Sequence, residues 1–239
     1  MRIRRKGPAE PTGTTDVTDD GEAGGTAAEE ATSESAETGA DRPAGPYDAD
    51  ELPDDRVPRV DLGSLLVAPA EGRDLRLHVD QKTGTVRAVM LQGPDGAVEL
   101  RAFAAPRNGD LWSEIRPQIA ADATRKGGSA TEREGRFGTE LLCEVKVQNK
   151  EGQVGTQTSR VVGINGPRWL LRATFLGRPA RDPDGATDWD ALIERVAVRR
   201  GSGPMPVGEQ LPLQLPPGAQ VGQNTVQAPP PDGVAGPGD

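Results

Sequence analysis

The chain contains one cysteine and one histidine, two residue types that often form a nucleophile and its base. Cys143 lies in phase with the apolar residues of its segment, whereas His78 lies out of phase with those of its own. Because successive side chains of a strand point to opposite faces, the two are predicted to face opposite sides of a sheet. The sequence therefore favours a buried, unreactive cysteine over a catalytic one.

Metal chemistry is also poorly supported by the residue types. One histidine and one cysteine leave too few ligands for a zinc site. Acidic residues gather only at Asp182, Asp184, Asp188 and Asp190, without the closing glutamate of a calcium loop, so the start of a capped helix is favoured there. Phosphate-loop, dinucleotide-binding, nucleophile-elbow and zinc-protease motifs are absent from the sequence. We predict no catalytic, cofactor-binding or metal-binding residue, and the sequence leans against an enzyme.

The feature that most strongly suggests a binding function is a predicted sheet face that mixes arginine with apolar residues. It is obtained by taking the residues that alternate with the apolar core positions of each expected strand. The candidate partner-binding residues are Arg76, Arg87, Arg101, Phe103 and Arg172, and the same phase includes His78, Leu91, Leu142, Lys146 and Leu170. If both helices cover the other face of the sheet, this face is open to a protein or a nucleic acid.

Two other interpretations of this face remain. It is either an ordinary solvated face, or it is covered by one helix and the apolar arm of residues 62–67. Single-strand binding usually stacks bases on several aromatic rings, and only Phe103 is available here.

The elements that position these residues follow from hydrophobic periodicity. The predicted class is α+β, a mainly antiparallel sheet with two helices in the order β-β-β-α-β-β-β-α. Pro117 falls inside the first helix, which Asp110 caps, and predicts a kink or a broken first turn. The strands are expected at residues 75–80, 85–92, 97–104, 138–148, 154–163 and 168–176, and the helices at about 110–126 and 187–198.

Composition divides the chain into three parts. Only 34% of the residues are hydrophobic and 3% aromatic, which supports one packed domain, predicted at residues 57–200. Residues 1–56 are predicted to form a disordered acidic tail with a basic N-terminus, and residues 201–239 a Pro/Gly-rich disordered tail. The segment Leu211–Pro216 favours polyproline II geometry and is either flexible or docked.

Charge is unevenly distributed around a net value of −9. Residues 1–55 hold five basic and fifteen acidic side chains, whereas residues 56–200 hold twenty-three basic and nineteen acidic ones. The predicted domain is mildly basic and the tail acidic, so the tail is expected to mask the domain's basic surface. The basic start is followed by polar residues, and no apolar run spans a bilayer, which predicts a cytoplasmic protein without a membrane span.

Several sequence strings resemble a known family. They are Arg59-Val60-Asp61-Leu62-Gly63, Leu100-Arg101-Ala102-Phe103-Ala104-Ala105-Pro106, Glu132-Arg133-Glu134-Gly135 with Phe137-Gly138-Thr139-Glu140-Leu141, and Gly166-Pro167-Arg168-Trp169 with Arg172 and Phe175-Leu176-Gly177. From Val57 to Pro216 the chain resembles an uncharacterised actinobacterial family, known as a domain of unknown function. The resemblance implies no activity, substrate, cofactor or site residue.

Two functions are expected from these observations. The first is a non-enzymatic binding or regulatory module whose mildly basic domain is masked by the acidic tail. The alternative is an enzyme or small-anion-binding domain with a pocket near the helix of Trp112 or of Trp189, using Arg168 or Arg172 to contact the anion. A deep pocket with converging polar groups favours the alternative.

Overall fold

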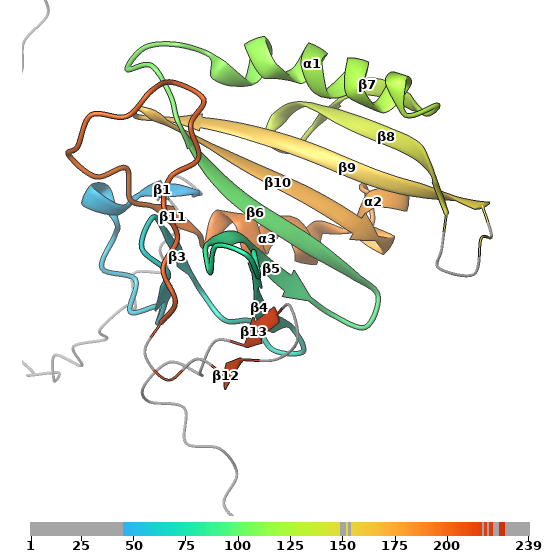
Figure 1. Ribbon diagram of the computed structural model, residues 1–239. Coiled ribbons are helices and arrows are strands. Elements are labelled where there is room, and N and C mark those ends of the chain that lie inside the picture. The colour runs from blue at the N-terminus through green and yellow to red at the C-terminus, as the bar shows by residue number, and fades with distance from the viewer. Residues whose placement is uncertain are drawn as a thin grey trace, which may run out of the picture. The chain divides into compact units, whose positions relative to one another are not determined.

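The computed structural model describes residues 45–148, 152, 154–216, 218, 220–221 and 225–227, and Figure 1 shows its architecture. The predicted disorder of residues 1–44, and of the C-terminal residues beyond 227, lies outside this range. The fold is α+β and mostly antiparallel, as the sequence predicts, but it contains more strands than the predicted order allows.

A nine-stranded sheet forms the body of the fold, in the order β12-β13-β4-β5-β6-β10-β9-β8-β7. All neighbouring strands in it pair antiparallel. The bounds are Asp74–Val79 for β4, Val86–Gln92 for β5, Gly96–Ala104 for β6, Ser129–Gly135 for β7, Gly138–Gln148 for β8, Val154–Gly166 for β9, Trp169–Gly177 for β10, Gln220–Val221 for β12 and Thr225–Gln227 for β13.

Strand β7 and the short β12 and β13 are the members of this sheet that the sequence analysis missed. In β7, Ser129–Gly135, every side chain is exposed or half-buried, so no apolar alternation marks it. Its place at the edge explains this composition, because an edge strand packs little and is protected by charge from pairing with other chains.

A second, four-stranded sheet has the order β1-β11-β3-β2. It consists of Tyr47–Asp48 (β1), Ala197–Val198 (β11), Leu65–Val67 (β3) and Val60–Asp61 (β2), and a 3-10 turn, η1, follows β1 at Ala49–Glu51. Strand β1 pairs parallel with β11, whereas the other pairs are antiparallel. The apolar arm of residues 62–67 therefore contributes β3 to a separate small sheet.

Three helical segments complete the described fold: α1 at Leu111–Arg125, α2 at Arg178–Arg181 and α3 at Thr187–Glu194. The predicted cap is confirmed, since the carboxylate of Asp110 accepts a hydrogen bond from the Ser113 backbone nitrogen at 3.0 Å. Helix α1 runs through Pro117 without a break, so of the two predicted outcomes, a kink or a broken first turn, the broken first turn is wrong. Helix α3 ends at Glu194, short of the predicted end at Val198, because the next residues enter β11.

The helices lie on opposite faces of the large sheet, as Figure 1 shows. Trp112 of α1 packs in one apolar cluster with Leu141, Val161 and Leu170. Trp189 of α3, together with the small sheet, packs in a larger cluster with residues of the alternate phase, among them Leu100, Leu171 and Phe175. The condition for an open face of arginine and apolar residues, that both helices cover the other face, is therefore not met.

The segment after residue 200 docks on the domain. Backbone hydrogen bonds join Leu211 N to Ala102 O at 2.9 Å and Ala104 N to Glu209 O at 2.8 Å. Single bridges pair Phe103 with Gln210 and Val86 with Leu213, so the segment lies between the start of β5 and the end of β6. Leu211 and Leu213 are buried there, which decides the question that the sequence left open.

Packed residues thus lie on both sides of the predicted limits at 57 and 200. Extending the range from residues 56–200 to residues 45–216 adds six acidic residues, five before Arg56 and Glu209 after Arg200. This part of the chain carries twenty-three basic and twenty-five acidic side chains, a net charge of −2. The prediction of a mildly basic domain therefore depends on limits, at residues 57 and 200, that lie inside the folded part. The folded part as a whole is slightly acidic, and its basic character is local.

Candidate functional site

Strand register gathers four of the five predicted partner-binding residues on one face of the large sheet. Arg172 of β10 lies directly opposite Arg101 of β6. Phe103 is two residues after Arg101 on β6 and therefore shares its face. Arg76 of β4 lies opposite Met90 of β5, and Met90 lies opposite Glu99 of β6, so Arg76 is on this face as well. We call the surface of Arg76, Arg101, Phe103 and Arg172 the arginine face.

Arg172, on β10, differs from the other cations of this face. Its guanidinium carbon lies 5.1 Å from the centre of the Phe103 ring, a cation–π arrangement. Burial, together with the positive charge of Arg101, lowers the pKa of Arg172. Among the described residues, no carboxylate pairs with Arg172 and no acceptor takes a hydrogen bond from it. The Glu99 carboxylate opposes this lowering from a distance but does not pair with Arg172, so a positive charge is held partly buried without a carboxylate in direct contact.

The neighbouring cations are already paired. Arg101 donates from Nε to the Glu99 carboxylate at 2.9 Å, and Arg76 lies 3.1 Å from the Asp74 carboxylate. His78 joins the same face, with Nδ1 3.7 Å from Glu99. The face as a whole is therefore close to neutral, and its unbalanced charge lies at Arg172.

Arg87 does not belong to this group. Arg87 lies three residues before Met90, so alternation along β5 does not place it with the other four residues. The β4–β5 register also shifts beside it, between His78 and Val79. Its guanidinium is 3.0 Å from the Asp80 carboxylate. The hydrogen bond from Arg87 lowers the pKa of Asp80.

Three more residues assigned to this phase lie on the opposite face. Leu91 is fully buried there, opposite Leu75, in the cluster that includes Trp189. Leu142 lies opposite Arg160, and Lys146 shares its phase along β8. Leu142 and Lys146 were expected on the arginine face because the apolar phase of every strand was taken to point to one side, whereas the apolar phase of β8 points to the side opposite to that of β6. Leu91 belongs to the buried phase of β5 itself.

The same error affected the only cysteine and histidine. Traced through the strand pairs, Cys143 and His78 lie on the same face, not on opposite faces. Strands β8 and β4 are five positions apart, about 24 Å at normal strand spacing, so the two cannot form a catalytic pair. Cys143 is buried, as predicted, and burial raises the pKa of its thiol.

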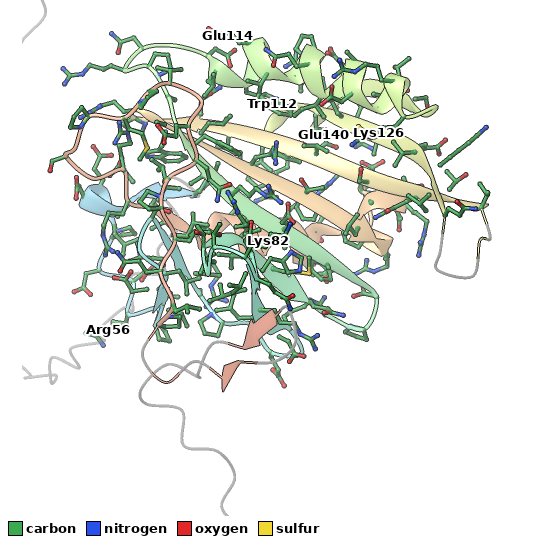
Figure 2. All side chains as sticks on the ribbon, in the orientation of Figure 1. Arg56, Lys82, Trp112, Glu114, Lys126 and Glu140 are labelled. Atoms are coloured by element: carbon green, nitrogen blue, oxygen red, sulfur yellow. The ribbon has the colours of Figure 1, made fainter. Side chains whose placement is uncertain are left out.

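Helix α1 packs on the same side of the sheet as the arginine face. Figure 2 shows Trp112 between α1 and the sheet, and its indole nitrogen donates to Thr139 O at 2.7 Å. The Trp112 ring lies on Gly163, and any Cβ atom at that position would overlap it. Gly163 pairs directly with Arg172, so the ring lies beside the strand that carries the unpaired cation. The sequence offers no signal for this role of Gly163 beyond a glycine inside a strand.

A buried ion network occupies the opposite face, where Figure 2 marks Glu140. Arg160, 2% exposed, pairs with Asp190 of α3, and its guanidinium lies 4.1 Å from the Phe175 ring centre. Glu140, 1% exposed, lies 4.0 Å from Arg160 and 3.0 Å from Arg133. Burial raises the pKa of Glu140 against the opposing effect of the two arginines. These groups attach α3 to the sheet. The sequence gives no sign of this network, because Arg160, Glu140 and Arg133 look like exposed strand residues and Asp190 looks like an exposed residue at the start of a helix.

A pocket was expected beside the helix of Trp112 or of Trp189. Two clefts are lined by described residues, and neither lining includes a residue of α1 or α3. Trp189 is fully buried, and the Arg73 guanidinium covers its ring at 4.1 Å. One cleft of about 520 Å³ lies against Leu142, Glu144 and Arg181. Another, of about 490 Å³, lies beside the small sheet. Arg168, with φ of 64°, occupies the β9–β10 turn, and Arg172 lies further along β10.

Within the described ranges, no group of three or more His, Cys, Asp or Glu side chains is arranged to hold a metal ion. The described helices are all too short or too polar to cross a membrane.

A family of proteins of unknown function, DUF3710, matches residues 45–221, which is most of the chain. The matched range contains the whole stretch from Val57 to Pro216, so the resemblance to a family of unknown function is confirmed. It begins at the first described residue and includes the small sheet, the three described helices and every strand of the large sheet except β13. A comparison with curated proteins gives no match.

Proposed function

The chain belongs to the DUF3710 family, and we propose that its folded part is a non-enzymatic protein-binding module that receives an acidic group of its partner on the arginine face. The observation that carries this proposal is the guanidinium of Arg172, held against Phe103 without a carboxylate among the described residues. A buried or half-buried charge is costly without a partner. A carboxylate delivered by a binding partner would offset that cost.

The surroundings of Arg172 favour a protein over a nucleic acid. Glu99 and Asp74 offset Arg101 and Arg76, so the face lacks the broad positive field that a phosphate chain requires. Phe103 already stacks with Arg172 and is not free to stack a base. Half-buried Met90 and Leu176 add apolar contact area to the same face. Arginine and apolar residues around a partly desolvated charge are typical of protein interfaces.

The test uses one arginine variant and a matched control. Arg172→Gln removes the unpaired charge, whereas Arg125→Gln removes the charge of an exposed helical arginine whose side chain is 76% exposed. Both full-length variants and the wild type are used to capture cross-linked partners from a host extract. Binding of hexaglutamate and of oligothymidylate is then measured by fluorescence anisotropy at low salt.

We expect the wild type and Arg125→Gln to capture a protein that Arg172→Gln does not capture. Hexaglutamate should compete with that protein for binding to the wild type. Loss of a charged hydrogen bond should weaken binding at least tenfold. If oligothymidylate binds in an Arg172-dependent manner and hexaglutamate does not, the protein-binding proposal is replaced by nucleic-acid binding. Equal behaviour of all three proteins towards every probe overturns it.

The acidic N-terminal segment enters the proposal as an electrostatic competitor. Residues 1–44 hold five basic and ten acidic side chains, a net charge of −5. A segment of that length without fixed structure would extend about 35 Å, far enough to compete at millimolar effective concentration. Deleting residues 1–44 should therefore tighten hexaglutamate binding two- to fivefold at low salt, and the gain should disappear as salt screens the charges. Unchanged affinity would remove the segment from the proposal.

A further inference from the structure

The cleft beside the small sheet has the features of a small-ligand site, independent of the arginine face. It encloses about 490 Å³ where the β2–β3 turn meets the residues after β11 and the docked C-terminal segment. That volume is within the usual range of small-molecule sites. The cleft thus combines three parts of the chain that are distant in sequence.

Backbone contacts hold the three parts in place. Gly63 has a φ of +83°, and its backbone nitrogen donates a hydrogen bond to the Asp61 carboxylate at 2.8 Å, which stabilises the tight turn. Ser64 N donates to Pro212 O at 3.2 Å, and Gln214 N donates to Leu62 O at 2.9 Å. The C-terminal segment is thereby held as one wall of the cleft.

Two hydrogen-bonding groups of the lining have no partner among the described residues. Ser64 is 5% exposed, and neither its hydroxyl nor the Arg200 Nε makes a hydrogen bond there. Buried polar groups are nearly always satisfied, because an unpaired one costs about 1–3 kcal/mol. The other cleft, of about 520 Å³, has no such unpaired group in its lining. The unpaired serine and arginine therefore distinguish the cleft beside the small sheet.

The charges of the lining indicate what the ligand is. Arg199 is engaged by the Asp61 carboxylate at 2.8 Å and by Gly63 O at 3.0 Å. Arg200 uses one nitrogen for Gly203 O at 3.2 Å and leaves the rest of its guanidinium available. With Asp61 counted against the two arginines, one positive charge is left, which a carboxylate balances better than a doubly charged phosphate.

Apolar residues complete the other side of the cleft. Leu215 is 46% exposed, one of the few large apolar side chains in the described ranges that is not packed, and it lines the cleft with Pro212 and Pro216. We propose that this cleft binds a small monocarboxylate with an apolar body, its carboxylate at Arg200 and Ser64 and its body against Leu215. Small local shifts would bring the Ser64 hydroxyl and the Arg200 Nε, both shielded from water in the free protein, into contact with the carboxylate.

The test is a titration of the full-length, nitrogen-15-labelled protein with benzoate, hexanoate and inorganic phosphate, followed by NMR. We expect benzoate or hexanoate to shift the amide signals of Gly63, Ser64 and Gly201 with a dissociation constant of about 1 mM or below. Arg200→Gln should weaken this binding about tenfold and Ser64→Ala about threefold. Arg125→Gln, the exposed control, should bind as the wild type does.

Ser64→Ala also has a stability readout that guards against a misfolded variant. Because the hydroxyl has no partner, its removal should leave the urea midpoint unchanged or raised, while carboxylate binding weakens. Tight binding of phosphate without carboxylate binding, or equal carboxylate binding by wild type, Arg200→Gln and Ser64→Ala, overturns the proposal. Neither result affects the arginine face, which is probed by Arg172→Gln.

Discussion

Trp169 and Asp48 are 121 residues apart in sequence, and the Trp169 indole nitrogen donates a hydrogen bond to the Asp48 carboxylate at 2.9 Å. Trp169 is 1% exposed at the start of β10, so the contact attaches β1 to the centre of the large sheet. The folded part therefore includes residues that composition alone assigned to the acidic tail.

Removal of that contact should lower stability. We expect Asp48→Ala to reduce the free energy of unfolding by about 1–2 kcal/mol, because the buried indole N–H loses its acceptor. Deletion of residues 1–44 should leave the urea midpoint unchanged, whereas deletion of residues 1–56 should lower it. Equal midpoints for the two deletions would show that β1 contributes nothing to stability.

Gly163 should tolerate no side chain. Its Cβ position coincides with the Trp112 ring, so Gly163→Ala should displace α1 and cost about 1–3 kcal/mol. Gly155 on the same strand is the matched control, since a Cβ there meets no atom within 4 Å. Gly155→Ala should be neutral or slightly stabilising in chemical denaturation. Similar losses for both variants would refute the assignment of Gly163 to Trp112.

Acid should weaken the Asp55–Arg59 pair in a defined pH range. The side-chain hydrogen bond from Arg59 lowers the pKa of Asp55 to about 2. A lowered carboxyl pKa stabilises the folded state above the unfolded value of about 4, and that contribution is lost as pH falls towards 2. Asp55→Asn should cost about 1 kcal/mol at pH 7 and flatten the stability profile between pH 4 and 2. The exposed neighbour variant Asp54→Asn should keep the wild-type slope.

The buried network should respond strongly to loss of its central cation. Arg160→Met leaves the carboxylates of Glu140 and Asp190 buried with fewer partners, at a cost of about 3–5 kcal/mol. Arg136→Met, at a pair whose arginine is 52% exposed, should cost less than about 1 kcal/mol.

The pH dependence of the Arg160 variant has a definite sign. Burial raises the pKa of Glu140 above its ordinary 4.5, so the folded state holds the proton more tightly and stability falls as pH rises through that interval. Loss of Arg160 raises this pKa further, so the penalty of Arg160→Met should be smaller at pH 5 than at pH 8. A penalty independent of pH would argue against an ionised Glu140.

Periodicity in the sequence determined the long strands of the large sheet and the apolar stripe of α1, because alternation and helical spacing are local properties. The Asp110 cap was predictable for the same reason. Strand β7 and the buried pair Arg160–Asp190 were not, since an edge strand needs no apolar phase and a buried ion pair looks polar.

Tertiary structure alone decided which way each strand faces. A period of two gives alternate sides but not their absolute direction, and the direction is set by which helix or sheet the apolar residues meet. With α1 on one face and α3 and the small sheet on the other, the buried phase changes face across the large sheet. That change removes Leu142 from the face of Phe103, Arg101 and Arg172, and it puts His78 on the side of Cys143. The docking of the C-terminal segment was also decided by the tertiary structure. Leu211 and Leu213 are buried because the segment fits between the start of β5 and the end of β6, and no local sequence pattern predicts that space.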